Sequence, residues 1–146
     1  MRKILIVEDN LMIADMVEEV LLAADYDVCG IATTVAQGMA LWKEHCPDLV
    51  VVDLRLAHGD LGTELAAKLA PFGEMGILYV TGNSCQVDLS SIDGHGCLSK
   101  PYVSADLLRC IQIVIDLAHG IAAKPPYPRG FHVLGAPALS SAAISS

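Results

Sequence analysis

Basic side chains are few in this chain of 146 residues, and long apolar runs are absent. Nine Lys and Arg stand against 17 Asp and Glu, so the formal net charge is −8. A nucleic-acid surface needs a basic stripe, and this balance argues against one. The apolar runs, such as Ile4 to Val7, fall far short of the roughly 20 residues that a membrane span needs. We therefore expect no nucleic-acid partner and no membrane segment.

Signals for secretion and for a disulfide framework are also missing. Arg2 and Lys3 precede an apolar stretch that already ends at Glu8, which is too short for a signal peptide. The five cysteines are scattered and form no C-x-x-C pair, so neither a zinc site nor a disulfide framework is expected. We expect these cysteines to be small buried thiols in a cytoplasmic protein.

One apolar stretch ends directly at a carboxylate. Leu49 to Val52 contains three valines and is followed by Asp53. An uninterrupted β-branched run predicts a strand that is buried on both faces, as in parallel sheets. Because a charge is costly inside such a sheet, Asp53 should lie at the strand's C-terminal edge. That edge is where ligands bind in open α/β sheets, although an acid there can also be a plain turn or cap residue.

Strand and helix patterns alternate along residues 1–120. We expect strands at 4–7, 28–32, 49–53, 76–80 and 97–99, and helices at 11–24, 34–46, 60–69 and 104–119, with a weak helix within 83–95. Asn10 and Ser104 are candidate helix caps, and Thr34 with Gln37 has the spacing of a capping box. His58 to Asp60 is an expected turn. Right-handed crossovers make this alternation a parallel sheet with helices on both faces.

The last 26 residues, 121–146, differ from the rest and are expected to form an extended tail. They contain four prolines, two glycines and no acidic residue, but also several large apolar side chains. Exposed apolar side chains would promote association with other molecules, so we expect these side chains to be buried. We expect either a homodimer interface built from the last helix and the region from Gly120 to Leu134, or a tail that folds back on its own domain.

Polar residues follow four of the five expected strands, at one edge of the sheet. They are Glu8 and Asp9, Asp53, Thr81 and Gly82, and Lys100 with Pro101. Converging carboxylates need a cation, and oxygen ligands favour Mg²⁺. A lysine can neutralise the remaining charge, while a hydroxyl and backbone N–H groups can receive an anion. Each of these residues or pairs, taken alone, is also common in structural roles at helix starts, in turns and in solvated loops. Together they suit a phosphoryl group that arrives on Asp53.

The chain resembles the receiver domain of bacterial two-component response regulators over about residues 2–119. The resemblance rests on ILIVEDN at 4–10, PDLVVVDL at 47–54, VTG at 80–82 and LSKPY at 98–102. It implies a flavodoxin-like sheet of five parallel strands in the order 2-1-3-4-5. It also implies phosphoryl transfer from a histidine kinase or phosphotransfer protein. Such a domain is not an enzyme beyond its Mg²⁺-dependent self-phosphorylation and autodephosphorylation.

The resemblance also implies roles for single residues. Asp53 would be the phosphate acceptor. Asp9, Asp53 and the Arg55 backbone carbonyl would bind Mg²⁺ directly, and Glu8 would act mainly through water. Thr81 would be the switch hydroxyl, and Lys100 would pair first with Asp53 and then with the phosphate. The Arg55 side chain and Gly82 would complete the phosphate site, and Pro101 would follow a cis peptide bond.

Several positions depart from the family pattern. Cys97 stands where the family usually has an aromatic residue that moves with the switch threonine. Ala57 replaces a common proline, and Gly62 falls one place later than the family glycine. The Cys97 departure lies on the family's output route across the fourth helix and fifth strand, whereas every acid and the lysine are present.

Other functions fit the sequence less well. A haloacid dehalogenase phosphatase would need an aspartate at position 55, where this chain has Arg55. A flavin-binding protein would need a phosphate loop after the first strand, where Glu8 and Asp9 would repel phosphate. We expect a stand-alone receiver that signals by protein contact, as a homodimer in the cytoplasm. The alternative is a degenerate receiver that binds partners without phosphorylation.

Overall fold

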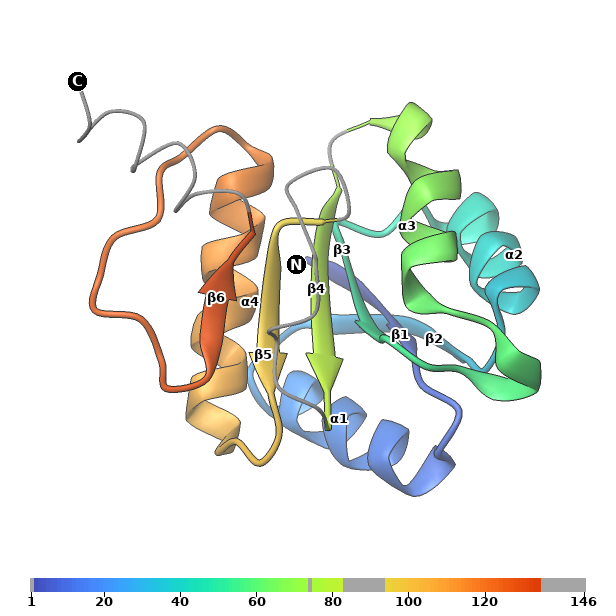
Figure 1. Ribbon diagram of the computed structural model, residues 1–146, viewed down its shortest axis with the longest axis horizontal. Coiled ribbons are helices and arrows are strands. Elements are labelled where there is room, and N and C mark those ends of the chain that lie inside the picture. Colours follow the sequence, from blue (N-terminus) through green and yellow to red (C-terminus); the bar gives the residue numbers. More distant parts are fainter. Residues whose placement is uncertain (1, 74, 83–93, 135–146) are drawn as a thin grey trace.

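A single mixed sheet forms the centre of the computed structural model, which describes residues 2–73, 75–82 and 94–134 (Figure 1). The strands are β1 (Lys3–Val7), β2 (Asp27–Ala32), β3 (Leu49–Asp53), β4 (Gly76–Thr81), β5 (Gly96–Ser99) and β6 (Phe131–Val133). The helices are α1 (Leu11–Ala23), α2 (Val35–His45), α3 (Gly62–Leu69) and α4 (Ser104–Ala118). Two short 3₁₀ turns, Ala57–Gly59 and Ala70–Phe72, flank α3.

The strand order is β2-β1-β3-β4-β5-β6, and neighbours from β2 to β5 are parallel. The predicted flavodoxin-like order is therefore confirmed for five strands. The prediction of only five strands is wrong, because β6 adds to β5 in the antiparallel direction. The chain returns along residues 121–130, and Gly130 then takes a left-handed conformation (φ 81°) that starts the strand. At least this part of the expected extended tail folds back on its own chain.

Two apolar layers lie on opposite faces of the sheet. Alternate strand residues point to each layer: Ile4 and Ile6 pack with α1 and α4, whereas Leu5 and Val7 pack with α2 and α3. Both faces are covered, which explains why β1, β3 and β4 have apolar runs without polar alternation. Helices α1 and α4 cover one face of the sheet, and α2 and α3 cover the other (Figure 1).

Two of the three predicted helix caps are present. The Asn10 side chain accepts from the N–H groups of Met12 and Ile13 at 3.1 and 3.3 Å. Thr34 accepts from the Gln37 N–H at 3.2 Å. The prediction that Ser104 caps the last helix is wrong: Val103, with an extended backbone, holds the cap position and Ser104 is the first helical residue.

Helix α3 also begins later than predicted. It starts at Gly62, because Asp60 has an extended backbone and its carboxylate instead accepts from the Val35 N–H of α2 at 2.9 Å. The predicted turn before it is present, with left-handed conformations at His58 and Gly59. The weak helix predicted within 83–95 lies almost wholly outside the described residues. In the part of the chain that is described, no helix is both long and apolar enough to cross a bilayer.

The cysteines differ from expectation at one position. Cys29, Cys46 and Cys110 are free thiols, and burial raises the pKa of Cys110 to about 12, which keeps that thiol protonated and inert at neutral pH. Cys97, however, is disulfide-bonded, so the expectation of thiols throughout is wrong for that residue. It is fully buried in β5 beside its register partner Tyr79 on β4. The large aromatic residue at this level of the core therefore comes from β4.

Candidate functional site

Four strand ends meet at one edge of the sheet and bring the predicted polar residues together. Asp53 is the last residue of β3 and is aligned with Val80 of β4, and Thr81 is aligned with Ser99 of β5. Glu8 and Asp9 directly follow β1, the other neighbour of β3. The parallel arrangement alone places these groups side by side, because each of the five parallel strands has its C-terminal end at this edge.

Three carboxylates form the centre of the site. Glu8, Asp9 and Asp53 each offer an oxygen, and these oxygens all lie within 4.8 Å of one another. Glu8 is buried, Asp53 is partly buried and Asp9 is exposed, so the cluster opens to solvent on the Asp9 side. A set of oxygen donors that is open on one side fits Mg²⁺, which retains several waters. The residues present could thus hold a divalent metal ion.

Lys100 supplies the positive charge that faces these carboxylates. Its Nζ atom lies 3.4 Å from Glu8 Oε1 and 3.8 Å from Asp53 Oδ2. Its backbone N–H donates to the Thr81 carbonyl at 2.8 Å, which ties the end of β5 to the end of β4. The Lys100–Pro101 peptide bond is cis, as the resemblance implies. The ammonium is therefore held between two acids and remains close to the open side.

Glu8 has both carboxylate oxygens engaged. Oε2 accepts from the Asn10 N–H at 3.1 Å while Oε1 faces Lys100. Burial raises the pKa of Glu8, the negative charge of Asp53 adds to this, and the Asn10 N–H and Lys100 oppose it. A carboxylate that is already paired in this way is a better anchor for Lys100 than a direct metal ligand.

The remaining predicted residues lie near the centre but contribute differently. Asp53 Oδ1 accepts from the Arg55 N–H at 3.4 Å, whereas the Arg55 side chain is exposed and forms no ion pair with any described carboxylate. Thr81 is buried at the end of β4. Gly82 is exposed, and a Cβ there would contact nothing within 4 Å.

Gly62 has a role that sequence reasoning missed. Its N–H donates to the Leu54 carbonyl at 2.9 Å, and a Cβ at this position would overlap the Asp53 carbonyl oxygen. The first turn of α3 thus presses against the backbone of the acceptor strand. A glycine at the start of a helix that follows an acidic strand end was the available signal.

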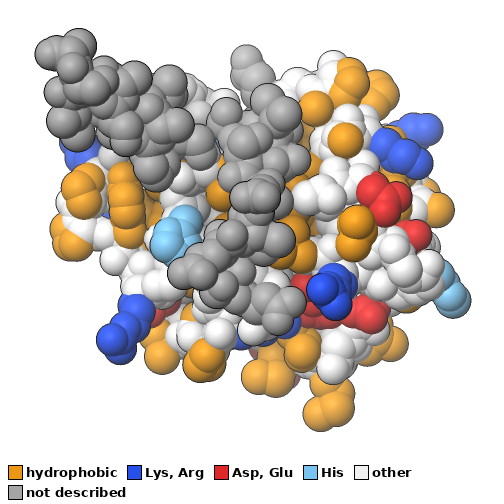
Figure 2. Space-filling model, viewed as in Figure 1, with side chains coloured by type: hydrophobic (Ala, Val, Ile, Leu, Met, Phe, Trp, Pro, Cys, Tyr) orange, Lys and Arg blue, Asp and Glu red, His pale blue; other side chains and the backbone are white. Residues whose placement is uncertain are grey.

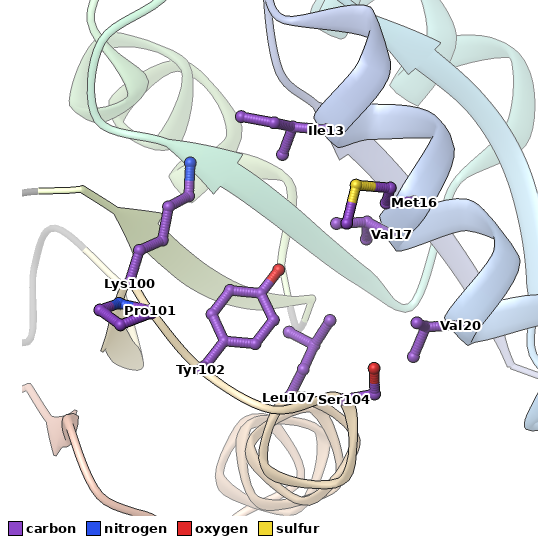
Figure 3. Close-up of a pocket in the computed structure, with 9 residues that line it drawn as sticks. All are labelled: Ile13, Met16, Val17, Val20, Lys100, Pro101, Tyr102, Ser104 and Leu107. Carbon is purple, nitrogen blue, oxygen red and sulfur yellow. The ribbon is translucent and has the colours of Figure 1, made fainter.

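An apolar groove of about 330 Å³ lies beside the carboxylates. Figure 3 shows its two walls facing one another. One wall comes from α1 and consists of Ile13, Met16, Val17 and Val20. The other comes from the connection after β5 and the first half of α4 and consists of Lys100, Pro101, Tyr102, Ser104 and Leu107. Met12 and Met16 of α1 are 77% and 65% exposed. Hydrophobic side chains are visible along the lower margin of the surface, where α1 lies (Figure 2). The groove continues from the reactive edge onto an exposed helix.

Known proteins share this sequence pattern. A family model described as "Response regulator receiver domain" matches residues 4–112. The chain is 34% identical to the chemotaxis protein CheY of Bacillus subtilis over 117 residues, which are 78% of this chain and 98% of CheY. It is 26% identical to the transcriptional regulatory protein PdtaR of Mycobacterium tuberculosis over 125 residues. That match covers 84% of this chain but only 60% of PdtaR.

Solved structures share the fold. A CheY-like receiver domain protein from Methanospirillum hungatei superposes with a TM-score of 0.70 at 26% identity and covers 82% of this chain and 98% of that one. The response regulator PhyR from Brucella abortus gives a TM-score of 0.72 at 20% identity, with 82% of this chain and 49% of PhyR covered. The matched segment contains the three carboxylates, Thr81 and Lys100. This chain belongs to the response regulator receiver domain family, whose members are signalling modules of two-component systems.

Proposed function

We propose that Asp53 accepts a phosphoryl group from a histidine kinase or phosphotransfer protein in a Mg²⁺-dependent phosphorelay. The observation that carries this proposal is the arrangement at the sheet edge, where Lys100 Nζ faces Asp53 at 3.8 Å beside a cluster of three acids. The complete acid set and the lysine favour phosphorylation over a degenerate receiver.

The transfer forms a bond between an Asp53 carboxylate oxygen and phosphorus. The bond from phosphorus to the donor's histidine nitrogen breaks, and its electron pair stays on the imidazole, which takes a proton from solvent. Lys100 offsets the charge of the phosphoryl oxygens, and the Thr81 hydroxyl and the Gly82 N–H are the proposed hydrogen-bond donors. Asp9, Asp53 and the Arg55 carbonyl would hold Mg²⁺, which supplies further neutralisation of the transferred group when bound.

The donor is proposed to be a protein. Exposed Met16 lines the apolar groove beside Lys100, and exposed Met12 lies one turn earlier on the same helix. Such a surface fits apolar side chains of a partner helix. Acidic Asp15, Glu18 and Glu19 on the same helix would favour a partner with basic residues around its contact. A homodimer remains a prediction, and one formed through the tail could not use Phe131, which is buried in its own chain.

Mass spectrometry after incubation with acetyl phosphate tests this function. With Mg²⁺ the chain should gain one phosphoryl group, and with excess EDTA in place of Mg²⁺ it should gain none. If neither acetyl phosphate nor a panel of purified histidine kinases adds a phosphoryl group, the chain acts as a phosphorylation-independent binding module instead.

Arg55 is proposed to lengthen the life of the phosphorylated state. Its exposed guanidinium follows the acceptor by two residues and can reach a phosphoryl group there, pairing with it and hindering water. We expect Arg55→Ala to dephosphorylate several-fold faster, measured as the decay of the phosphorylated mass after removal of acetyl phosphate. Arg55→Lys, which keeps the charge, should lie between the two. An Arg55→Ala decay equal to that of the unchanged chain would contradict this role.

A further inference from the structure

Main-chain hydrogen bonds link the acceptor edge to the C-terminal strand. The Lys100 N–H donates to the Thr81 carbonyl at 2.8 Å, and the N–H of the preceding residue, Ser99, donates to the Gly130 carbonyl at 3.0 Å. Lys100 also faces Asp53 through its side chain. Two consecutive residues at the end of β5 therefore contact the reactive site on one side and the start of β6 on the other.

Strand β6 is closely fitted to its own sheet. Phe131 is 5% exposed, and its ring lies against Gly96, where a Cβ would come within 2.7 Å of a ring carbon. At the other end of β6, the Leu134 N–H donates to the His95 carbonyl at 3.0 Å and its side chain is buried. Residues 130–134 thus dock as one unit along the whole of β5.

The segment between α4 and β6 is held much less firmly. Most residues from 121 to 130 are exposed. Arg109 Nη2 donates to the Pro126 carbonyl at 3.2 Å, and the Tyr127 ring meets Phe131 edge-on with centroids 5.9 Å apart. Because these contacts are exposed, release of β6 chiefly requires Phe131 to leave the core cluster that it shares with α4.

We propose that β6 is an intramolecular latch that phosphorylation of Asp53 releases; this rests on the proposed function. A phosphoryl group on Asp53 attracts the Lys100 ammonium and the Thr81 hydroxyl, which lie at the ends of β5 and β4. Movement of these ends displaces Ser99 from Gly130 and weakens the first contact of β6. Because linkage is reciprocal, a weakened latch must stabilise the phosphorylated state at equilibrium by the same factor.

Hydrogen exchange by NMR on the full chain, with and without acetyl phosphate and Mg²⁺, tests the release. Mass spectrometry of the same samples measures the fraction phosphorylated. We expect the Ser99 and Leu134 amides to exchange at least several-fold faster in the phosphorylated chain, while the Val51 amide in β3 stays unchanged. Unchanged or slower exchange in a phosphorylated sample overturns the latch. A missing mass shift instead overturns the proposed function, and the latch with it.

Two glycine variants test the reciprocal effect. Gly130 and Gly120 both have left-handed backbones, with φ of 81° and 79°, but only Gly130 lies against Ser99. Gly130→Ala should speed Leu134 exchange in the unphosphorylated chain and raise the phosphorylated fraction at limiting acetyl phosphate. Gly120→Ala, with the same strain at the end of α4, should do neither. Faster Leu134 exchange in Gly130→Ala without a gain in phosphorylation would overturn the coupling.

Discussion

Asp53→Asn will gain no phosphoryl group from acetyl phosphate and Mg²⁺, whereas the unchanged chain will gain one. The amide lacks the negative oxygen that attacks phosphorus, and it removes one of the three acids within 4.8 Å of one another. The substitution keeps the size of the side chain, so the fold should be preserved. Mass spectrometry of the intact chain gives the result directly.

Asp48→Asn is the matched control. Asp48 precedes the same strand at its opposite end, where its carboxylate accepts from the Lys3 N–H at 2.8 Å and lies 3.8 Å from Arg2. This variant should be phosphorylated like the unchanged chain. Phosphorylation of Asp53→Asn to the same extent as Asp48→Asn would mean that another side chain is the acceptor.

Gly62→Ala will destabilise the protein and impair the acceptor together. The added methyl group would overlap the Asp53 carbonyl oxygen, and a backbone atom in a central strand cannot move aside as a flexible side chain can. We expect the free energy of unfolding to fall by about 2–3 kcal/mol, the upper range for overpacking, as measured by urea denaturation. The displaced Asp53 should also be phosphorylated more slowly by acetyl phosphate.

Gly59→Ala separates backbone strain from this overlap. Gly59 has φ 78° and open space where the methyl group of alanine would lie, so the substitution costs only the left-handed strain, roughly 1–2 kcal/mol. Its rate of phosphorylation should match that of the unchanged chain. If Gly62→Ala is phosphorylated just as fast as Gly59→Ala, the contact between α3 and β3 does not position the acceptor.

Much of the fold could be predicted because its strands appear in the sequence as uninterrupted apolar runs. Leu49 to Val52 must be covered on both faces, and the alternation with helices then fixes parallel pairing. The same logic places Asp53 and Lys100 at one edge, since Asp53 ends β3 and Lys100 directly follows β5. Neither step requires knowledge of a contact between distant side chains.

The features that were not predicted depend on contacts between residues that are far apart in the sequence. Strand β6 has only three residues, and its place is set by the fit of Phe131 to Gly96, which no local pattern reveals. Asp60 reads as a helix start, but its carboxylate caps α2 from another loop. Ser104 is a good cap residue by type, yet the extended backbone that a cap requires occurs at Val103.

The antiparallel strand at the end of the sheet also bears on how the protein behaves at high concentration. An uncovered edge strand is a template for pairing with other molecules, which leads to aggregation. In this chain β6 covers β5 from Gly96 to Leu98 and itself offers an edge of only three residues. A chain shortened before Phe131 would leave the apolar β5 edge open, and its solubility would fall even if its reactive site were intact.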